Sequence, residues 1–228
     1  MKIGIIGAMK SEVALLKSAM TDIKPYSKAG MEFFVGKLGA TDVVVAQCGI
    51  GKVNAAVCTQ ILIDDCAVTH IINTGVAGSL TAKLSIGDMV VSSDAVQHDY
   101  SVAPIGFRKG EIPFTGCVGF PADEELRQKA LKSIAQNLPQ VKALSGRVCS
   151  GDQFIASKAE KERIIAEFDG ACVEMEGAAI AQVCFLNKIP FVILRAISDD
   201  AEDGGHMTFE EFEALAAANS AKVVQGML

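Results

Sequence analysis

Tryptophan is absent from this sequence, and aromatic residues make up only 6% of it. A core of this composition must therefore be aliphatic, built from Val, Ile, Leu and Ala. Basic residues are not in excess, because 21 Lys and Arg stand against 27 Asp and Glu, a formal net charge of −6. That balance argues against a nucleic-acid partner. Low-complexity stretches and proline-rich linkers are also missing, which excludes a mainly disordered chain.

No apolar run approaches the roughly 18 residues that a membrane helix needs, so neither a membrane span nor a membrane partner is predicted. The opening apolar run, residues 1–7, is too short for the hydrophobic region of a signal peptide. Metal-ligand spacing is missing too, since His70, His98 and His206 do not cluster with cysteines. We therefore expect a cytoplasmic protein that uses no metal or other cofactor.

The cysteines show no disulfide or metal pattern, because their number, seven, is odd and no two form a CxxC motif. Most of them lie inside apolar runs. We interpret them as small buried side chains in a reducing compartment. They are Cys48, Cys58, Cys66, Cys117, Cys149, Cys172 and Cys184.

Half of the 228 residues are apolar, which is enough for a sizeable core, and we expect one domain over residues 1–228. Strand-like runs alternate with helical segments, which predicts an α/β domain with a mostly buried sheet and helices outside. The predicted strands are 2–7, 31–37, 42–47, 70–74, 88–93, 143–149, 171–175 and 191–197. The predicted helices are 10–20, about 51–65, 123–136, 157–168, 176–187 and a terminal one that Thr208 caps.

The segment 98–121 contains three prolines and four glycines and shows no helical or strand period. We predict a long loop there. Long loops inside compact domains tend to be functional, so this one is a candidate part of a binding site.

In open α/β sheets, ligands bind beyond the carboxyl ends of the strands. Five predicted strands end in glycines, carboxylates or an arginine, in the segments 7–12, 74–78, 150–154, 173–176 and 195–200. We therefore expect carboxylates, glycine-rich turns and Arg195 to converge on one rim of the sheet.

Several of these features also have an ordinary structural explanation. Glu12 lies in the first turn of a predicted helix, where an acid complements the helix dipole. The glycine pairs 49/51 and 75/78 lack the full GxGxxG pattern, so tight turns between strand and helix explain them better. A turn or a helix cap would also explain Asp199, although an acid that follows an apolar strand and Arg195 is poorly placed to be mere surface decoration.

Glu174 and Glu176 are harder to dismiss, because they end an apolar strand and flank Met175. The two acids are two positions apart at the end of that strand, where the direction of each side chain decides which one can reach the site. We therefore expect one carboxylate to point toward the site and the other away from it.

Six stretches together resemble the nucleosidases that cleave 5′-methylthioadenosine and S-adenosylhomocysteine, within the purine nucleoside phosphorylase superfamily. They are KIGIIGAMKSEV (2–13), GIGKVNAA (49–56), INTGVAGSL (72–80), SGDQFI (150–155), VEMEGAAIAQVC (173–184) and PFVILRAISDDA (190–201). They cover nearly the whole chain in order. The resemblance implies a three-layer α/β/α fold with a central mixed, partly barrel-like sheet surrounded by helices.

The resemblance also implies an activity, hydrolysis of the N-glycosidic bond of these nucleosides and of 5′-deoxyadenosine. Glu12 looks like the acid that orients or deprotonates the attacking water, with Arg195 nearby. Glu176 looks like the carboxylate that grips the ribose hydroxyls, with Met175 under the sugar. Asp199, helped by Ser198, looks like the acid that protonates N7 of adenine.

The remaining residues of the implied site would hold the base and the 5′ substituent. Phe154 resembles a purine-stacking aromatic, and the backbone of Ile155 would read the adenine edge. Further substrate contacts are implied for Met9, Ile50, Val76, Ala77, Gly78, Glu174 and Phe209. The long loop would add Val102, Ile105, Phe107 and Pro113, reaching across the interface of a homodimer.

The chemistry is consistent with these roles. Breaking the C1′–N9 bond passes through an oxocarbenium-like state, a problem that glycosidases solve with two carboxyl groups in different protonation states. Adenine leaves poorly as an anion, and general acid catalysis is worth about 10²–10⁴-fold. Asp199 would need a pKa raised by burial, whereas we expect Glu12 to stay ionised beside Arg195. A negative site also favours the positive charge on the ribose.

The chain departs from the family pattern at two places. Many relatives carry serine at the position of Val76, so we expect an altered balance of substrates. Lys10 and Ser11 replace acids often found beside Glu12, which leaves Glu12 as the one acid of that segment.

Three other functions stay open. A phosphorylase of the same superfamily would need a cationic phosphate site, but residues 1–107 contain no arginine, which favours water. A non-catalytic adenosine sensor would not need the full set Glu12, Glu176 and Asp199. A nucleosidase for aminodeoxyfutalosine in menaquinone synthesis is compatible with the change at Val76.

Overall fold

The described part of the molecule comprises residues 1–199 and 209–228 of a computed structural model, with side chains described for 1–198 and 214–228. Its centre is a mixed sheet. The predicted helix cap Thr208 lies outside the described residues. The strands are β1 (Lys2–Gly7), β2 (Thr21–Lys28), β3 (Met31–Leu38), β4 (Thr41–Gln47), β5 (His70–Ser79), β6 (Met89–Gln97), β7 (Phe120–Pro121), β8 (Ala143–Ser150), β9 (Cys172–Glu174) and β10 (Phe191–Asp199).

The sheet is partly closed. Its strand order is β10-β6-β8-β9-β5-β1-β4-β3-β2, with β7 paired to β6. Because β10 also pairs with β5, the strands from β10 to β5 form a closed barrel, and β1, β4, β3 and β2 extend from it. β1 is parallel to both of its neighbours, whereas β3 is antiparallel to both of its own. The predicted mixed, partly barrel-like sheet is confirmed.

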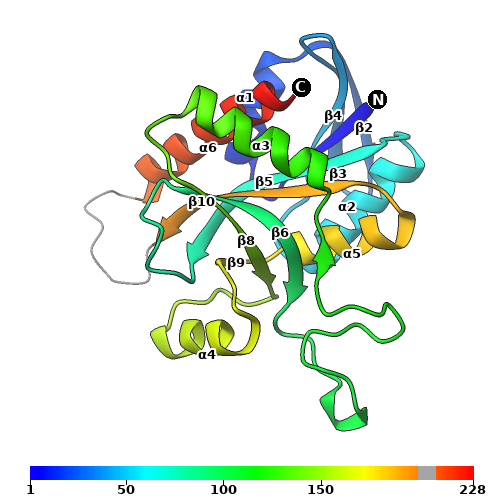
Figure 1. The fold of residues 1–228 in the computed structure, drawn as a ribbon. Coiled ribbons are helices and arrows are strands. Elements are labelled where there is room, and N and C mark those ends of the chain that lie inside the picture. The colour runs from blue at the N-terminus through cyan, green and yellow to red at the C-terminus, as the bar shows by residue number, and fades with distance from the viewer. Residues whose placement is uncertain (200–208) are drawn as a thin grey trace.

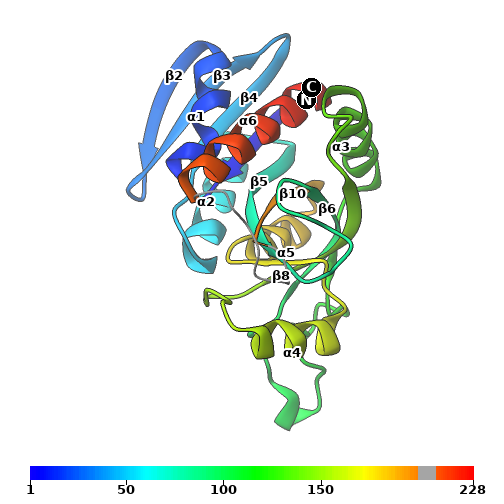
Figure 2. The same ribbon diagram turned by 90° about the vertical axis from the view of Figure 1, so that its left-hand side faces the viewer.

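Helices cover the sheet on both sides (Figures 1 and 2). They are α1 (Lys10–Ala19), α2 (Lys52–Asp64), α3 (Glu124–Asn137), α4 (Lys158–Phe168), α5 (Gly177–Asn187) and α6 (Phe209–Met227). α1 and α3 pack on α6, and α2 packs on α5. α4 lies below the barrel in Figure 1. This arrangement confirms the predicted α/β/α fold.

Both faces of the sheet are buried, because alternate residues of one strand enter different cores. Ile3 and Ile5 of β1 contribute to the core that includes α1, α3 and α6. Ile6, the next residue, contributes to the core with α2 and α5. These cores are aliphatic, as the composition predicts. Of the seven free cysteines, all but the half-buried Cys117 are buried, which confirms that they serve as small core residues.

Three segments differ from the prediction. β2 was not expected, because its sequence is polar and contains Pro25. β5 continues to Ser79, where residues 75–79 were expected to form a turn. The loop 98–121 includes a single 3₁₀ turn (Ala103–Ile105) and the short β7. None of the described helices is long and apolar enough to cross a membrane.

Candidate active site

Glu12 is fixed at the point where β1 gives way to α1. Its carboxylate accepts hydrogen bonds from the backbone N–H groups of Ala8 at 2.7 Å and Met9 at 3.0 Å, so it caps its own helix. It also accepts one from Val76 of β5 at 3.2 Å. The structural explanation of Glu12 is therefore confirmed, and the same contacts hold a buried carboxylate beside the middle of β5.

Arg195 lies at the centre of the site, on β10, with only 1% of the residue exposed. Its Nη2 donates to Asn73 Oδ1 at 2.7 Å and to the carboxylate of Glu174. The same nitrogen is 3.7 Å from Glu176 Oε2. The guanidinium is thus anchored between β5, β9 and the start of α5.

Gly75 gives this cluster the space it needs. It pairs with Arg195 in the register of β5 and β10. A Cβ atom at position 75 would lie 2.1 Å from Arg195 Nη1 and 2.6 Å from Glu12 Oε1. The interpretation of Gly75 and Gly78 as a tight turn is wrong, because both residues are in β5 and Gly78 pairs with β9.

Glu174 and Glu176 both face Arg195, so the expectation that one of them points away is wrong. β9 ends at Glu174, and Glu176 has φ −133° and ψ −40° as the N-cap of α5. The strand alternation therefore stops between them. Glu174 accepts from Ser150 Oγ and from the amides of Glu176 and Gly177, while Glu176 Oε1 accepts from Gly51 N at 2.8 Å.

Burial and the neighbouring groups shift the pKa values of two of these carboxylates, Glu12 and Glu176. Burial raises the pKa of Glu12, although Arg195 and the three amides oppose this. Burial and the charge of Glu174 raise the pKa of Glu176 to about 7, against the opposing effects of Arg195 and Gly51 N. The site is therefore poised to hold negative charge next to a cation, and to change that charge near neutral pH.

The other predicted residues fall into three groups. Met9, Val76, Gly78, Met175 and Ser198 are half-buried, and Ala77 and Ile155 are buried; they lie on β5, on β10 and on the segments that follow β1, β8 and β9. Ser198 Oγ donates to Ala77 O at 3.3 Å. Ile50 and Phe154 are exposed, at 57% and 85%. The side chains of Asp199 and Phe209 lie outside the described part of the structure.

The loop residues are not brought to this cluster within one chain. Figure 1 shows the loop 98–121 extending below the body of the molecule. Ile105 is 71% exposed, whereas Val102, Phe107 and Pro113 are half-buried. Phe107 packs edge-on against Phe114 of the same loop, with ring centroids 6.2 Å apart.

Sequence reasoning missed Asn73 and Ser150, which support the charged groups. Asn73 accepts from Arg195 and donates to Ile6 O at 3.0 Å, and Ser150 Oγ donates to Glu174 and accepts from Ala178 N at 2.7 Å. Both are fully buried polar residues in or at the end of apolar strands. That pattern was a usable signal, because buried polar groups need partners.

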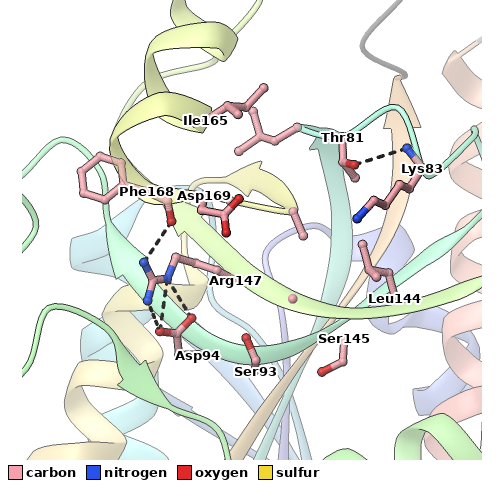
Figure 3. Close-up of a pocket in the computed structure, with 14 residues that line it drawn as sticks. Thr81, Lys83, Ser93, Asp94, Leu144, Ser145, Arg147, Ile165, Phe168 and Asp169 are labelled. Carbon is pink, nitrogen blue, oxygen red and sulfur yellow. Dashed lines mark hydrogen bonds and ion pairs between the residues drawn. The ribbon is translucent and has the colours of Figure 1, made fainter.

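A cavity of about 470 Å³ lies apart from this cluster, between β8, the end of α4 and the segment after β5 (Figure 3). Its walls include Lys83, Asp94, Arg147 and Asp169. None of the predicted site residues lines it. Among residues 1–199 and 209–228, no three His, Cys, Asp or Glu side chains are grouped as a metal site would require.

Comparison with known proteins gives full-length matches. The model of the phosphorylase superfamily matches residues 2–228. The curated 5′-methylthioadenosine/S-adenosylhomocysteine nucleosidase of Colwellia psychrerythraea strain 34H is 43% identical over 232 residues, which cover 100% of this chain and 96% of that protein. A solved structure of such a nucleosidase from Colwellia psychrerythraea 34H, in complex with adenine, has a TM-score of 0.93 and 44% identity and covers 100% of this chain and 94% of its own.

Two further solved structures extend the comparison. The 5′-methylthioadenosine/S-adenosylhomocysteine nucleosidase of Neisseria meningitidis, in complex with methylthio-immucillin-A, is 38% identical with a TM-score of 0.93, over 99% of this chain and 97% of its own. The futalosine hydrolase of Helicobacter pylori strain 26695 is 35% identical with a TM-score of 0.90, over 99% and 96%. The chain therefore belongs to the phosphorylase superfamily, among the nucleosidases of that family.

Proposed function

We propose that this protein hydrolyses the N-glycosidic bond of 5′-methylthioadenosine and S-adenosylhomocysteine, releasing adenine and the 5′-thio-substituted ribose. The observation that carries the proposal is the buried group of Glu12, Glu174 and Glu176 around Arg195, in a chain 43% identical to a named nucleosidase. 5′-Deoxyadenosine belongs to the same substrate class, because the bond that breaks does not involve the 5′ substituent.

In the proposed reaction, the oxygen of a water molecule bonds to C1′ while the electrons of the C1′–N9 bond pass to adenine. Glu12 takes a proton from the water, and Asp199 gives a proton to N7 of the departing base. Glu176 accepts hydrogen bonds from the ribose hydroxyls. The carboxylates favour the positive charge that the ribose develops in the transition state.

Water is preferred to phosphate because the described part of the cluster holds three acids and a single arginine. Arg195 is the one arginine in the described part of the cluster, and its Nη2 already serves Glu174 and Asn73. Three acids nearby would repel a phosphate dianion. Adenine release should therefore be equally fast with and without phosphate, and a strict phosphate requirement would establish a phosphorylase instead.

One assay separates the remaining candidates. The values of kcat/KM for adenine release are compared for methylthioadenosine, S-adenosylhomocysteine, 5′-deoxyadenosine and aminodeoxyfutalosine. The two thioethers should give the highest kcat/KM values. Preference for aminodeoxyfutalosine would support the second candidate, which the 35% identity to a futalosine hydrolase favours. Equal, slow adenine release by the wild type and Asp199→Asn would instead support a non-catalytic sensor.

We also propose a homodimer in which the loop 98–121 completes the partner's site. Large apolar side chains are exposed on the α2 and α5 pair, at Val53 (73%) and Leu186 (63%). Others are exposed on the loop, at Ile105 (71%) and Phe114 (99%). Such side chains on two neighbouring helices and a projecting loop are typical of an interface. Sedimentation equilibrium should therefore give twice the chain mass.

A further inference from the structure

Three segments that are far apart in the sequence are joined beside the active site by a closed ring of hydrogen bonds. Lys52, the first residue of α2, donates from Nζ to Asp99 Oδ1 at 2.7 Å. The other oxygen of Asp99, which follows β6, accepts from Asp152 N at 2.9 Å. Asp152, which follows β8, accepts from Lys52 N at 2.8 Å and so closes the ring.

Within this ring, the ion pair Lys52–Asp99 is better covered than an ordinary surface ion pair, whereas Asp152 is exposed. The side chains of Lys52 and Asp99 are only 18% and 16% exposed. Lys52 Nζ also donates to Gln97 Oε1 at 3.0 Å, and the amide of Gln97 donates to Gln182 of α5. Burial raises the pKa of Asp99, but Lys52 and the amide of Asp152 lower it by more, so its pKa lies below the ordinary value. Asp99 is therefore ionised at neutral pH.

Each side of the ring is linked by the backbone to a predicted substrate contact. Gly51, next to Lys52, donates its N–H to Glu176 Oε1 at 2.8 Å. Gly51 has φ +97°, and a Cβ there would lie 3.1 Å from Asp152 Oδ1, so glycine permits the close approach. Asp152 lies two residues before Phe154, in a segment without regular secondary structure.

We infer that Lys52, Asp99 and Asp152 are positioning residues that fix the distance between the ribose-binding carboxylate and the loop that holds the adenine. The inference rests on the proposed function, because Glu176 and Phe154 have those roles only there. None of the three is assigned to touch the substrate. They determine where Gly51 N and residues 152–155 lie. That placement affects the binding of the substrate and of the transition state equally.

Lys52→Met tests the inference, because it keeps the backbone N–H and the length of the stem but removes the ammonium group. We expect KM for methylthioadenosine to rise about tenfold or more while kcat falls less than about threefold, the pattern of lost uniform binding. Hydrogen exchange should accelerate at the amides of 51–52 and 152–155. Lys52→Arg should restore most of the affinity, and Asp99→Asn should repeat the loss from the other partner.

The matched control is Lys37→Met, which removes a cation from the exposed pair Lys37–Asp42, with a 2.6 Å N–O distance. Its KM should not change. An unchanged KM in both Lys52→Met and Asp99→Asn would overturn the inference, as would a KM that rises equally in the control. A wild type that releases no adenine would refute the proposed function, and calorimetric adenine affinity would then test the ring by itself.

Discussion

Glu176 experiences two opposing electrostatic influences, and the balance places its titration in the physiological range. Burial and Glu174 raise its pKa to about 7, while Arg195 and the amide of Gly51 hold it from rising further. Only the ionised carboxylate has its full capacity to accept hydrogen bonds from two ribose hydroxyls. Substrate binding is therefore expected to depend on pH through this residue.

As pH falls below about 7, Glu176 takes up a proton, and kcat/KM for methylthioadenosine should decrease about tenfold per unit. Above that pH the carboxylate stays ionised and kcat/KM should level off. Glu176→Gln should bind weakly at every pH and lose this acidic limb. If the limb persists in Glu176→Gln, it belongs to another group, and Glu12, whose pKa burial also raises, is then the first to examine.

Gly75 is the residue whose enlargement should damage the site most directly. A Cβ there would be 2.1 Å from Arg195 Nη1, and the guanidinium cannot yield because Glu174 and Asn73 hold it. Gly75→Ala should lower kcat at least about 100-fold by displacing Arg195 and Glu12. Gly30→Ala is the control, since φ is +74° there but no atom lies within 4 Å. It should lower Tm by a few degrees and leave kcat unchanged, whereas an active Gly75→Ala would contradict the geometry.

The strands and helices with a clear apolar period could be predicted from the sequence. Elements that form only because a neighbouring strand pairs with them could not. β1 and β4 are apolar on both faces because both faces are covered, and the sequence pattern reports that directly. β2 is an exposed edge strand that is held to β3 mainly by backbone pairing, with Tyr26 as its one half-buried side chain, so its sequence shows no apolar period. The predicted strand 70–74 ends before β5 does, because the glycines that follow it resemble a turn.

The same distinction applies to the site. Glu12, Glu176 and Arg195 follow from strand ends and from the family resemblance. Gly75 and Asn73 serve the site only through a neighbouring strand, and their partners lie more than 60 positions away in the sequence. A single sequence does not encode that register explicitly, which is why these supports were missed.

Arg147 connects three elements around the cavity of Figure 3, and this should be a matter of stability rather than activity. From β8 it donates Nη2 to Asp94 Oδ2 of β6 at 2.6 Å and Nη1 to the carbonyl of Phe168, the last residue of α4, at 2.9 Å. Arg147→Met should lower the free energy of unfolding by about 1–3 kcal/mol, because Asp94 loses its charged partner. Urea unfolding measures this.

The kinetic constants of Arg147→Met should stay within about twofold of the wild type, because Arg147 touches no residue of the carboxylate cluster. The exposed pair Lys37–Asp42 gives the comparison, since Lys37→Met should cost about 0–1 kcal/mol. Equal losses of unfolding free energy in Arg147→Met and Lys37→Met would show that the contacts of Arg147 stabilise the fold no more than an ordinary surface ion pair does.

The carboxylate cluster and the projecting part of the loop, residues 102–114, lie apart within one chain, and the proposed dimer would bring them together. The loop extends from the body and exposes Ile105 and Phe114, while the cluster lies at the carboxyl ends of β1, β8 and β9. If the loop of one protomer completes the site of the other, each site is built from two chains. Defects in the cluster and in the loop should then complement each other in trans.

Glu12→Gln and Phe107→Ala protomers, co-expressed with different tags, provide the test. In a mixed dimer, one site has both defects and the other has an intact cluster with an intact loop. Random assembly makes half of the dimers mixed, so the mixture should recover about one quarter of wild-type activity per site. A mixture of Glu12→Gln with Glu176→Gln should recover nothing, because each site then keeps one defective cluster residue. If the first mixture shows only the sum of its parents, the loop serves its own protomer, and the shared site is wrong.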